Sequence, residues 1–217
     1  MIITVFGDVH GNLITLEKLF KLEKSETDLF ISHGDIVNYG PWSNDCIAFL
    51  NNQNNCKLLK GNHEKYFIDG FYDGTNVVAR SFFDFCFDKF DNGNKKIIEN
   101  YTDSFETENF TIQHTLFDKY IFADTDISEN KINKNFIIGH SHQQYERDLG
   151  NFKIYNTGSL GQNRSFINVC NYLKIDTETN VVTLKSFTHN IDAVINQMKS
   201  QHYPTICTDY YLSKNRI

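Results

Sequence analysis

Three short apolar runs in the first third of the chain alternate with segments in which apolar residues recur at helical spacing. The runs predict strands at MIITVFGD, DLFISHGD and CKLLKGNHE, and the last of these leads into a loop. Helices are predicted between them at residues 12–25 and 42–52, with Ser43 or Asn44 as the cap of the second helix. This order of strands and helices is typical of a parallel sheet with right-handed crossovers.

The remainder of the chain is richer in strands. Segment 65–108 holds many aromatic residues and predicts a helix around NVVARSFFDFCFDKF. After it we expect four strands, a hairpin, a helix and a polar tail. The strands are NFTIQHT, YIFAD, NFIIGHSH and FKIYNTGSL, the hairpin joins NVCNYLKID to VVTLKSF, and the helix lies near IDAVINQMKS. A parallel half followed by a strand-rich half predicts an α/β fold of two sheets packed face to face with helices outside.

Composition narrows the classes of function. A net charge of −6 argues against an extended nucleic-acid surface, and no apolar run is long enough to span a bilayer. The N-terminus lacks the pattern of a signal peptide, so we expect a cytoplasmic protein. The five cysteines are odd in number and include no CxxC, which predicts reduced thiols. With two prolines and no linker-like stretch, we expect one domain over residues 1–217, of undetermined oligomeric state.

Residues that commonly bind metals follow the predicted strands. Because strand ends converge at one edge of a parallel sheet, these side chains are expected in a single crevice. They are Asp8, His10, Asp35, Asn62, His63, His114, His140 and His142. The set is too large for one ion with an open position and suits two divalent ions that share a carboxylate. Mixed nitrogen and oxygen ligands favour Mn, with Fe, Zn, Co, Ni or Mg as alternatives.

The motifs GDVHGN, GDIVNYGP, GNHE, QHT, GHSH and NTGS carry a family resemblance. Over about residues 1–165 the chain resembles the calcineurin-like metallophosphoesterases, and especially their small bacterial phosphodiesterase branch, which is related to diadenosine tetraphosphatases. The resemblance implies a four-layer αββα sandwich of two mixed sheets flanked by helices. It also implies that Asp35 bridges two metals, the first held by Asp8, His10 and His142 and the second by Asn62, His114 and His140. The chain departs from the family pattern at His33, usually apolar, and at Thr157, commonly proline.

These observations predict a metal-dependent phosphoesterase. A water or hydroxide between the ions would attack phosphorus in line, while His63 protonates the leaving oxygen or stabilises the developing charge. The substrate could be a phosphodiester or a phosphomonoester, including a nucleotide. The alternative is a protein-interaction scaffold on the same fold, like the retromer subunit that resembles this family. A scaffold would have no need of His63 or of a complete set of ligands.

Further residues have two possible roles each. Asn12 and Arg164 are candidates for contacts to the phosphoester, and the alternatives are a helix cap for Asn12 and an ordinary glycine turn around Arg164. His33 is expected to point away from Asp35, with outer support of the ligands as the alternative. His189 and His202 are expected at the surface.

The glycines of the motifs and the aromatic segment also allow two interpretations. Gly7, Gly11, Gly34, Gly61 and Gly139 are expected where the backbone passes close to the ions, although plain turns would also suit them. Segment 65–108 lies between two ligand motifs and is expected to form a helical cap over the crevice. Its phenylalanines would form the buried side of a helix, or some rings would face the crevice and stack on a nucleobase.

Overall fold

The computed structural model describes residues 1–217 and contains two five-stranded mixed sheets. The first sheet has the order β10-β9-β1-β2-β3. In it, β1 (Ile2–Phe6), β2 (Leu29–Ser32) and β3 (Cys56–Leu58) are parallel, and β9 (Val169–Asp176) and β10 (Val181–Thr188) extend it as an antiparallel hairpin.

The second sheet has the order β4-β5-β6-β8-β7. Its central strands β5 (Phe110–Gln113), β6 (Asn135–Ile138) and β8 (Lys153–Thr157) are parallel, and β4 (Ser104–Glu106) and β7 (Gln144–Asp148) are antiparallel edges. The prediction of two mixed sheets flanked by helices is therefore confirmed.

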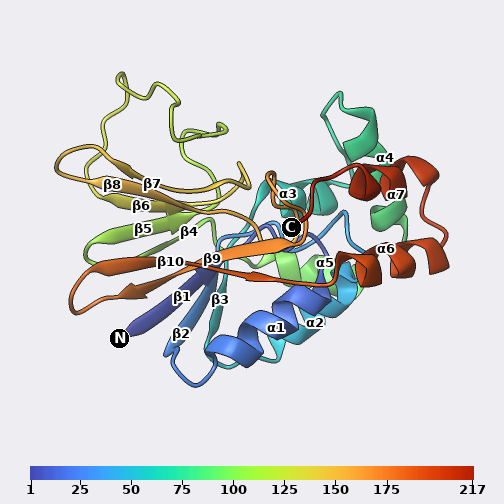
Figure 1. Cartoon of the computed structure of the whole chain (residues 1–217), viewed down its shortest axis with the longest axis horizontal. Helices are drawn as coiled ribbons and strands as arrows, with labels where there is room; N and C mark the ends of the chain where they lie inside the picture. The colour runs from blue at the N-terminus through green and yellow to red at the C-terminus, as the bar shows by residue number, and fades with distance from the viewer.

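The two sheets pack face to face through an apolar core. Ile3 and Ile31 of the first sheet share this core with Ile112 and Ile137 of the second, and all four are fully buried. Because successive side chains of a strand alternate between faces, Phe6 of β1 and Phe30 of β2 point to the opposite side, toward the helices. Figure 1 shows the second sheet above the first and the helices beneath and beside them.

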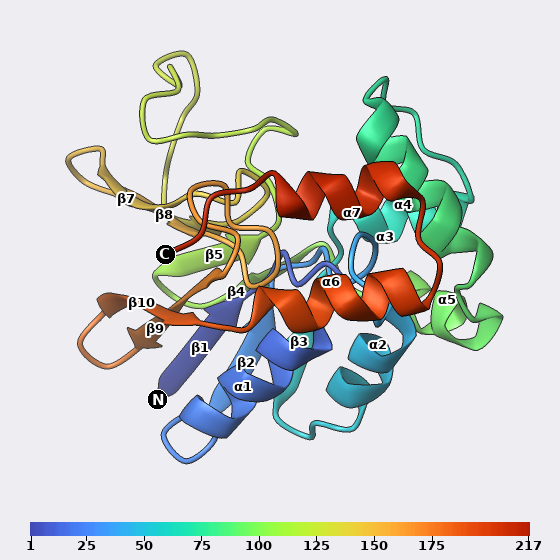
Figure 2. The same cartoon turned by 45° about the vertical axis from the view of Figure 1, so that its right-hand side comes forward.

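Seven helices complete the fold, and none is long and apolar enough to cross a membrane. Helices α1 (Leu13–Glu23) and α2 (Ser43–Asn51) are crossovers of the first sheet, and α6 (Ile191–Ser200) and α7 (Thr205–Leu212) follow β10. Between β3 and β4 lie α3 (Asn62–Asp69), α4 (Val77–Asp88) and α5 (Asn92–Glu99). Helix α7 packs on both α4 and α6, as Figure 2 shows.

The outer face of the second sheet is covered without a helix. Ile138 and Ile154 of this sheet pack against Leu116, Ile121 and Ile127, which belong to the irregular segment 114–134. The predicted strand YIFAD falls in this segment and is wrong. Its Ile121 carbonyl accepts a hydrogen bond from the Tyr145 hydroxyl at 2.7 Å, so a side chain takes the place of a neighbouring strand.

Other local predictions differ from the structure at element ends. Helix α2 begins after Trp42 with no side-chain cap, because the Ser43 hydroxyl instead accepts the Asn38 backbone N–H. The expected loop at GNHE is the first turn of α3, and the expected polar tail contains α7, which buries Cys207 and Tyr211 one helical turn apart. Strands β4 and β7 and helix α5 were not predicted, because they are short and mostly exposed.

Candidate metal centre

The loops that follow β1, β2, β5 and β6 meet the first turn of α3 at one edge of the two sheets. The loop after β1 carries Asp8 and His10, and the loop after β2 carries Asp35. Asn62 and His63 begin α3, His114 follows β5, and His140 and His142 follow β6. The expectation that these side chains share one crevice is met for every one of them, from both sheets.

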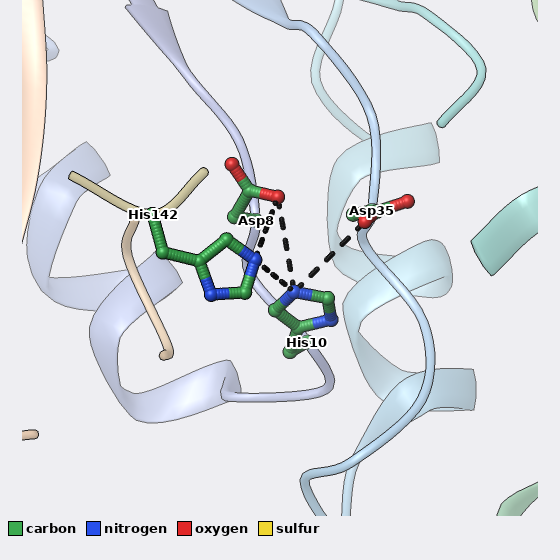
Figure 3. A group of neighbouring side chains, drawn as sticks. All are labelled: Asp8, His10, Asp35 and His142. Carbon is green, nitrogen blue, oxygen red and sulfur yellow. Dashed lines mark hydrogen bonds and ion pairs between the residues drawn. The ribbon is translucent and has the colours of Figure 1, made fainter. Parts of the chain in front are cut away.

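Asp8, His10, Asp35 and His142 form the first of two groups, with ligand atoms within 4.8 Å of one another. Figure 3 shows both imidazoles turned toward the two carboxylates. Nε2 of His142 lies 3.2 Å from Asp8 Oδ1, and Nε2 of His10 lies 3.8 Å from the same oxygen and 4.0 Å from Asp35 Oδ2.

Asp35, His114 and His140 form the second group. Nε2 of His114 lies 3.2 Å from Asp35 Oδ2, 3.2 Å from His140 Nδ1 and 2.9 Å from Asn62 Oδ1. Burial opposes a charge on His114, but the adjacent Asp35 carboxylate outweighs it and raises the pKa of His114 to about 9. The two groups share Asp35, so its carboxylate stands between two sets of ligand atoms.

The atoms of the first group fit a bound cation. Nδ1 of His142 donates to the Gln162 carbonyl at 2.9 Å, and Nδ1 of His10 lies 3.4 Å from the Val37 carbonyl. A neutral ring that donates through Nδ1 presents a lone pair at Nε2. The two Nε2 atoms lie only 3.1 Å apart, next to a buried Asp8 Oδ1 that has no hydrogen-bond partner. Three acceptors therefore converge with no donor among them, and a divalent cation would satisfy all three.

Electrostatics agree with this interpretation. Burial alone would raise the pKa of both carboxyl groups, but positive charge at His142 beside Asp8 and at His114 beside Asp35 holds it well below its usual range, and a bound cation in place of that charge would act in the same direction. Burial also lowers the pKa of His10 well below its usual range. The first group therefore carries two carboxylates, which is the charge state that favours a cation.

Most of the candidate ligands have a strained backbone. Five of the seven have φ in the left-handed region, where a non-glycine residue is uncommon. They are Asp8 at 48°, His10 at 49°, Asp35 at 55°, His140 at 65° and His142 at 56°. Such strain costs on the order of 1–3 kcal/mol per residue and concentrates at functional sites. The chain ends each strand with a tight turn that directs a ligand into the crevice.

His63 lies at the crevice without belonging to either group. Its Nε2 is 3.9 Å from Asp35 Oδ2, and its Nδ1 is 2.9 Å from Asn38 Nδ2. The Asn38 amide is oriented by its other atom, because Oδ1 accepts the Tyr39 backbone N–H at 2.8 Å. Asn38 therefore donates to Nδ1, and the neutral His63 ring carries its proton on Nε2, facing the crevice. Burial lowers the pKa of His63, which favours this neutral form.

Glu64 has a part in the site that sequence reasoning did not assign. Its buried carboxylate accepts backbone N–H groups from Asp35 and Ile36 at 2.7 Å, from Gly61 at 2.8 Å and from Val37 at 3.2 Å. Glu64 thus ties the loop that carries Asp35 to the first turn of α3. A glutamate three residues after Gly61, at a helix start, was the available signal.

The crevice opens into two pockets. The larger, of about 440 Å³, is lined by Asp35, His63, His140 and His142 together with Tyr39, Tyr72, Tyr210, Arg164 and Lys214. The smaller, of about 310 Å³, is lined by Asn62, His114 and His140 together with Lys60 and Lys65. Tyr120 belongs to both pockets and stacks on the His140 ring at 3.8 Å between centroids. The Arg164 guanidinium lies over Tyr120 at 5.7 Å.

The aromatic segment contributes to the larger pocket differently from the expectation. Phe82 and Phe83 are buried, and Phe87 and Phe90 pack on Phe67 of α3, so these rings form the buried side of a helix. The pocket wall from this segment is instead made by Tyr72, Asn76, Val78 and Ala79.

Several single-residue predictions can be compared with the structure. Asn12 caps α1 by accepting the Thr15 N–H at 3.3 Å and is buried, whereas Arg164 is exposed and lines the larger pocket. His202 is exposed as expected, but the surface prediction for His189 is wrong. His189 is buried, and its Nε2 lies 3.3 Å from the Ile167 carbonyl.

The expectation that His33 points away from the site is wrong. The backbone leaves the extended conformation at Gly34, with φ at 114°, so strand alternation does not apply. Nε2 of His33 lies 3.8 Å from Asp8 Oδ2. A side chain at Gly7 or Gly139 would overlap the His33 ring, so the requirement for these two glycines comes from this ring.

Comparisons with known proteins agree with this geometry. Residues 1–195 match the family model of the calcineurin-like phosphoesterases. A metallophosphoesterase from Sphaerobacter thermophilus has the same fold, with a TM-score of 0.79 at 21% identity over 98% of each chain. A candidate diadenosine tetraphosphatase superimposes with a TM-score of 0.60 at 12% identity, over 87% of this chain and 95% of that one.

A curated relative matches over a shorter stretch. The catalytic subunit A1 of serine/threonine-protein phosphatase 2B from Saccharomyces cerevisiae is 31% identical over 87 residues. The match covers 37% of this chain but only 16% of the yeast protein.

Proposed function

The chain belongs to the calcineurin-like phosphoesterase family, and from this premise we propose that it hydrolyses phosphoester bonds with two divalent metal ions. The observation that carries the proposal is the convergence of two groups of ligand atoms on Asp35, with an unpaired Asp8 Oδ1 beside the two Nε2 atoms of His10 and His142 in the first group. Asp8, His10 and His142 would hold one ion, Asn62, His114 and His140 would hold the other, and Asp35 would serve both. When bound, the ions supply an activated water and neutralise charge on the phosphoryl oxygens.

His63 is the residue that we propose acts directly on the phosphoester. Its neutral ring presents an Nε2–H group to the crevice, because Asn38 occupies Nδ1. This group can donate a hydrogen bond to a phosphoryl oxygen or to the leaving oxygen as negative charge develops there. Protonating His63 at Nδ1 would place two donors face to face, so the contact with Asn38 supports hydrogen bonding by a neutral ring over transfer of a full proton.

A phosphodiester fits the surroundings of the centre better than a monoester. Tyr120 and His140 line both pockets. Each pocket also contains two basic side chains, Arg164 and Lys214 in one and Lys60 and Lys65 in the other. A diester has two substituents, one for each pocket, and anionic or nucleotide substituents suit the basic and tyrosine-lined walls. A monoester would leave one pocket without a partner.

We propose Mn²⁺ as the metal, because the ligand set mixes imidazole nitrogens with carboxylate and amide oxygens. Fe, Zn, Co, Ni and Mg are the alternatives to test. The cytoplasm is the proposed location, and five cysteines without a disulfide support it.

The proposal is tested with metal-stripped protein reloaded separately with Mn²⁺, Mg²⁺, Zn²⁺ or Co²⁺. Each form is offered an aryl phosphodiester, a cyclic nucleotide, a dinucleoside polyphosphate and a nucleoside monophosphate. We expect about two Mn²⁺ per chain and a higher kcat/KM for diesters than for the monophosphate.

Two variants assign the chemistry to the site. His63→Ala should lower kcat roughly 10²–10³-fold while both metals remain bound. His202→Asn is the matched control. His202 is exposed and lies outside the motifs that supply the ligands, so this variant should leave kcat unchanged. A protein that binds two ions but hydrolyses no member of the panel would favour the scaffold alternative, and a protein that binds one ion or none would refute the dinuclear site.

A further inference from the structure

His33 is a fully buried histidine that lies directly behind the first group of ligands. The segments that carry Asp8 and His140 both close on its ring, because Gly7 and Gly139 leave no room for a side chain there. The question is what an imidazole does in this position.

Its hydrogen bonds identify the proton-bearing nitrogen. Nε2 of His33 lies 2.7 Å from the Thr157 hydroxyl oxygen, and that hydroxyl in turn donates to the Gly158 carbonyl at 3.2 Å. A hydroxyl has one proton, so a threonine that donates to a carbonyl accepts from its other partner. Nε2 of His33 therefore carries the proton and donates to Thr157, while Nδ1 has no partner.

The same Nε2–H lies beside Asp8. Asp8 Oδ2 is 3.8 Å from His33 Nε2 and accepts the His140 backbone N–H at 3.0 Å. Asp8 Oδ1 faces the opposite way, toward His142, and accepts no hydrogen bond. The two oxygens of one carboxylate are thus divided, with Oδ2 held by the His140 N–H and packed beside His33 Nε2, and Oδ1 left bare toward the ligand cluster.

We propose that His33 and Thr157 form a positioning pair that fixes the orientation of the Asp8 carboxylate and so strengthens binding at the first metal position. The inference rests on the proposed function, because it needs that position to hold a metal ion. His33 also packs beside the His114 ring of the second position, at 5.7 Å between centroids, but its Nε2 lies 3.8 Å from Asp8 Oδ2, so we expect the larger effect at the first position. His33 and Thr157 are 124 residues apart in the sequence, and in the structure they contact each other.

The test removes the hydroxyl with little change of shape. Thr157→Val deletes the acceptor of His33, and Thr157→Ser keeps it. Thr4→Val is the matched control, since Thr4 is a fully buried threonine of β1 whose hydroxyl pairs with that of Thr27 at 2.7 Å. Each protein is stripped of metal, checked for folding by its melting temperature, and titrated with Mn²⁺ in a calorimeter.

We expect Thr157→Val to weaken one of the two Mn²⁺ equivalents by about 10–100-fold, the usual effect of losing a residue that orients a ligand. The other equivalent should change by much less, Thr157→Ser should restore the wild-type value, and Thr4→Val should leave both equivalents unchanged. To assign the weakened Mn²⁺ equivalent to one metal position, Thr157→Val is combined with a second substitution that removes a ligand of only one position. The effect of Thr157→Val should persist in His114→Ala and disappear in His10→Ala.

Three results would overturn the inference. Thr157→Val could bind both equivalents as the wild type does, weaken both equally, or behave like Thr4→Val. Should Thr157→Val fail to fold, Thr157→Ser combined with His33→Asn replaces it, and unchanged Mn²⁺ binding in that double variant would equally overturn the inference. A wild-type protein that binds no Mn²⁺ would overturn the proposed function as well, whereas wild-type binding of two ions with unaffected variants refutes the positioning pair alone.

Discussion

Replacement of Glu64 by glutamine should destabilise the protein far more than the loss of one surface charge would. The carboxylate accepts four backbone N–H groups, two at each oxygen. Glutamine keeps one oxygen and presents an N–H donor in place of the other. Whichever way the amide turns, two buried backbone N–H groups lose their acceptor and face a donor.

The size of the effect follows from those two lost bonds. A hydrogen bond to a charged group contributes about 1.5–3 kcal/mol, so Glu64→Gln should lower the free energy of unfolding by about 3–6 kcal/mol. With a urea m-value of about 2–3 kcal/mol/M, the midpoint should fall by about 1–3 M. The measurement belongs at pH 8, because burial and the neighbouring Asp35 raise the pKa of Glu64 to about 7 and the argument needs the ionised form.

The assay is urea unfolding of metal-free protein, followed by hydrogen exchange of the amides of residues 35–37. Glu17→Gln, at an exposed position of α1, is the control and should stay within about 0.5 kcal/mol of the wild type. Exchange at residues 35–37 should accelerate in Glu64→Gln alone. A loss of stability below about 1 kcal/mol, with exchange unchanged, would refute the assignment of Glu64 as the anchor of the Asp35 loop.

Two further predictions concern charge. Asp35→Asn should weaken both Mn²⁺ equivalents, because its carboxylate belongs to both ligand groups, and calorimetry that shows one equivalent intact would contradict the shared role. Glu23 tests a pH dependence away from the site: burial would raise its pKa, but hydrogen bonds from Lys174 at 2.7 Å and Tyr172 at 2.5 Å outweigh burial and lower it. Because the folded pKa lies below the ordinary value of 4.5, the stability advantage of wild type over Glu23→Gln should be complete above about pH 5 and shrink as pH falls below 4.5, which urea unfolding at pH 7 and pH 3.5 would measure.

The ligands could be predicted from the sequence because each follows an apolar strand in a short motif. The rule that parallel strand ends share an edge accounts for Asp8 and Asp35 in the first sheet and for His114 and His140 in the second. Helix α1 and the β9–β10 hairpin were predicted for a similar reason, since their periodicity is local. Prediction failed where a tertiary contact decides the structure. The segment YIFAD is not a strand, and its Ile121 carbonyl accepts a hydrogen bond from the Tyr145 side chain instead of from a neighbouring strand.

The residues that support the ligands could not be predicted in the same way. Asn38, Glu64 and His33 bind other protein groups, and their partners are distant in sequence. A polar residue in a motif therefore gave no indication of whether it faces an ion or holds the residue that does. Rules for extended strands also fail here, because the backbone is left-handed at Asn38 and at Gly34, next to His33, and Glu64 lies in a helix.

Strain at the ligands explains why so many supporting contacts occur. A left-handed aspartate or histidine persists only if its surroundings fix it. The loops after β1 and β2 fix each other, since Asp8 N–H donates to the Gly34 carbonyl at 2.9 Å and His10 N–H donates to the Asp35 carbonyl at 3.0 Å. These two ligand loops are thus hydrogen-bonding partners. It follows that substitutions at non-ligand positions of these loops should impair metal binding without removing any ligand atom, and that the ligand list alone understates how much of the sequence the site requires.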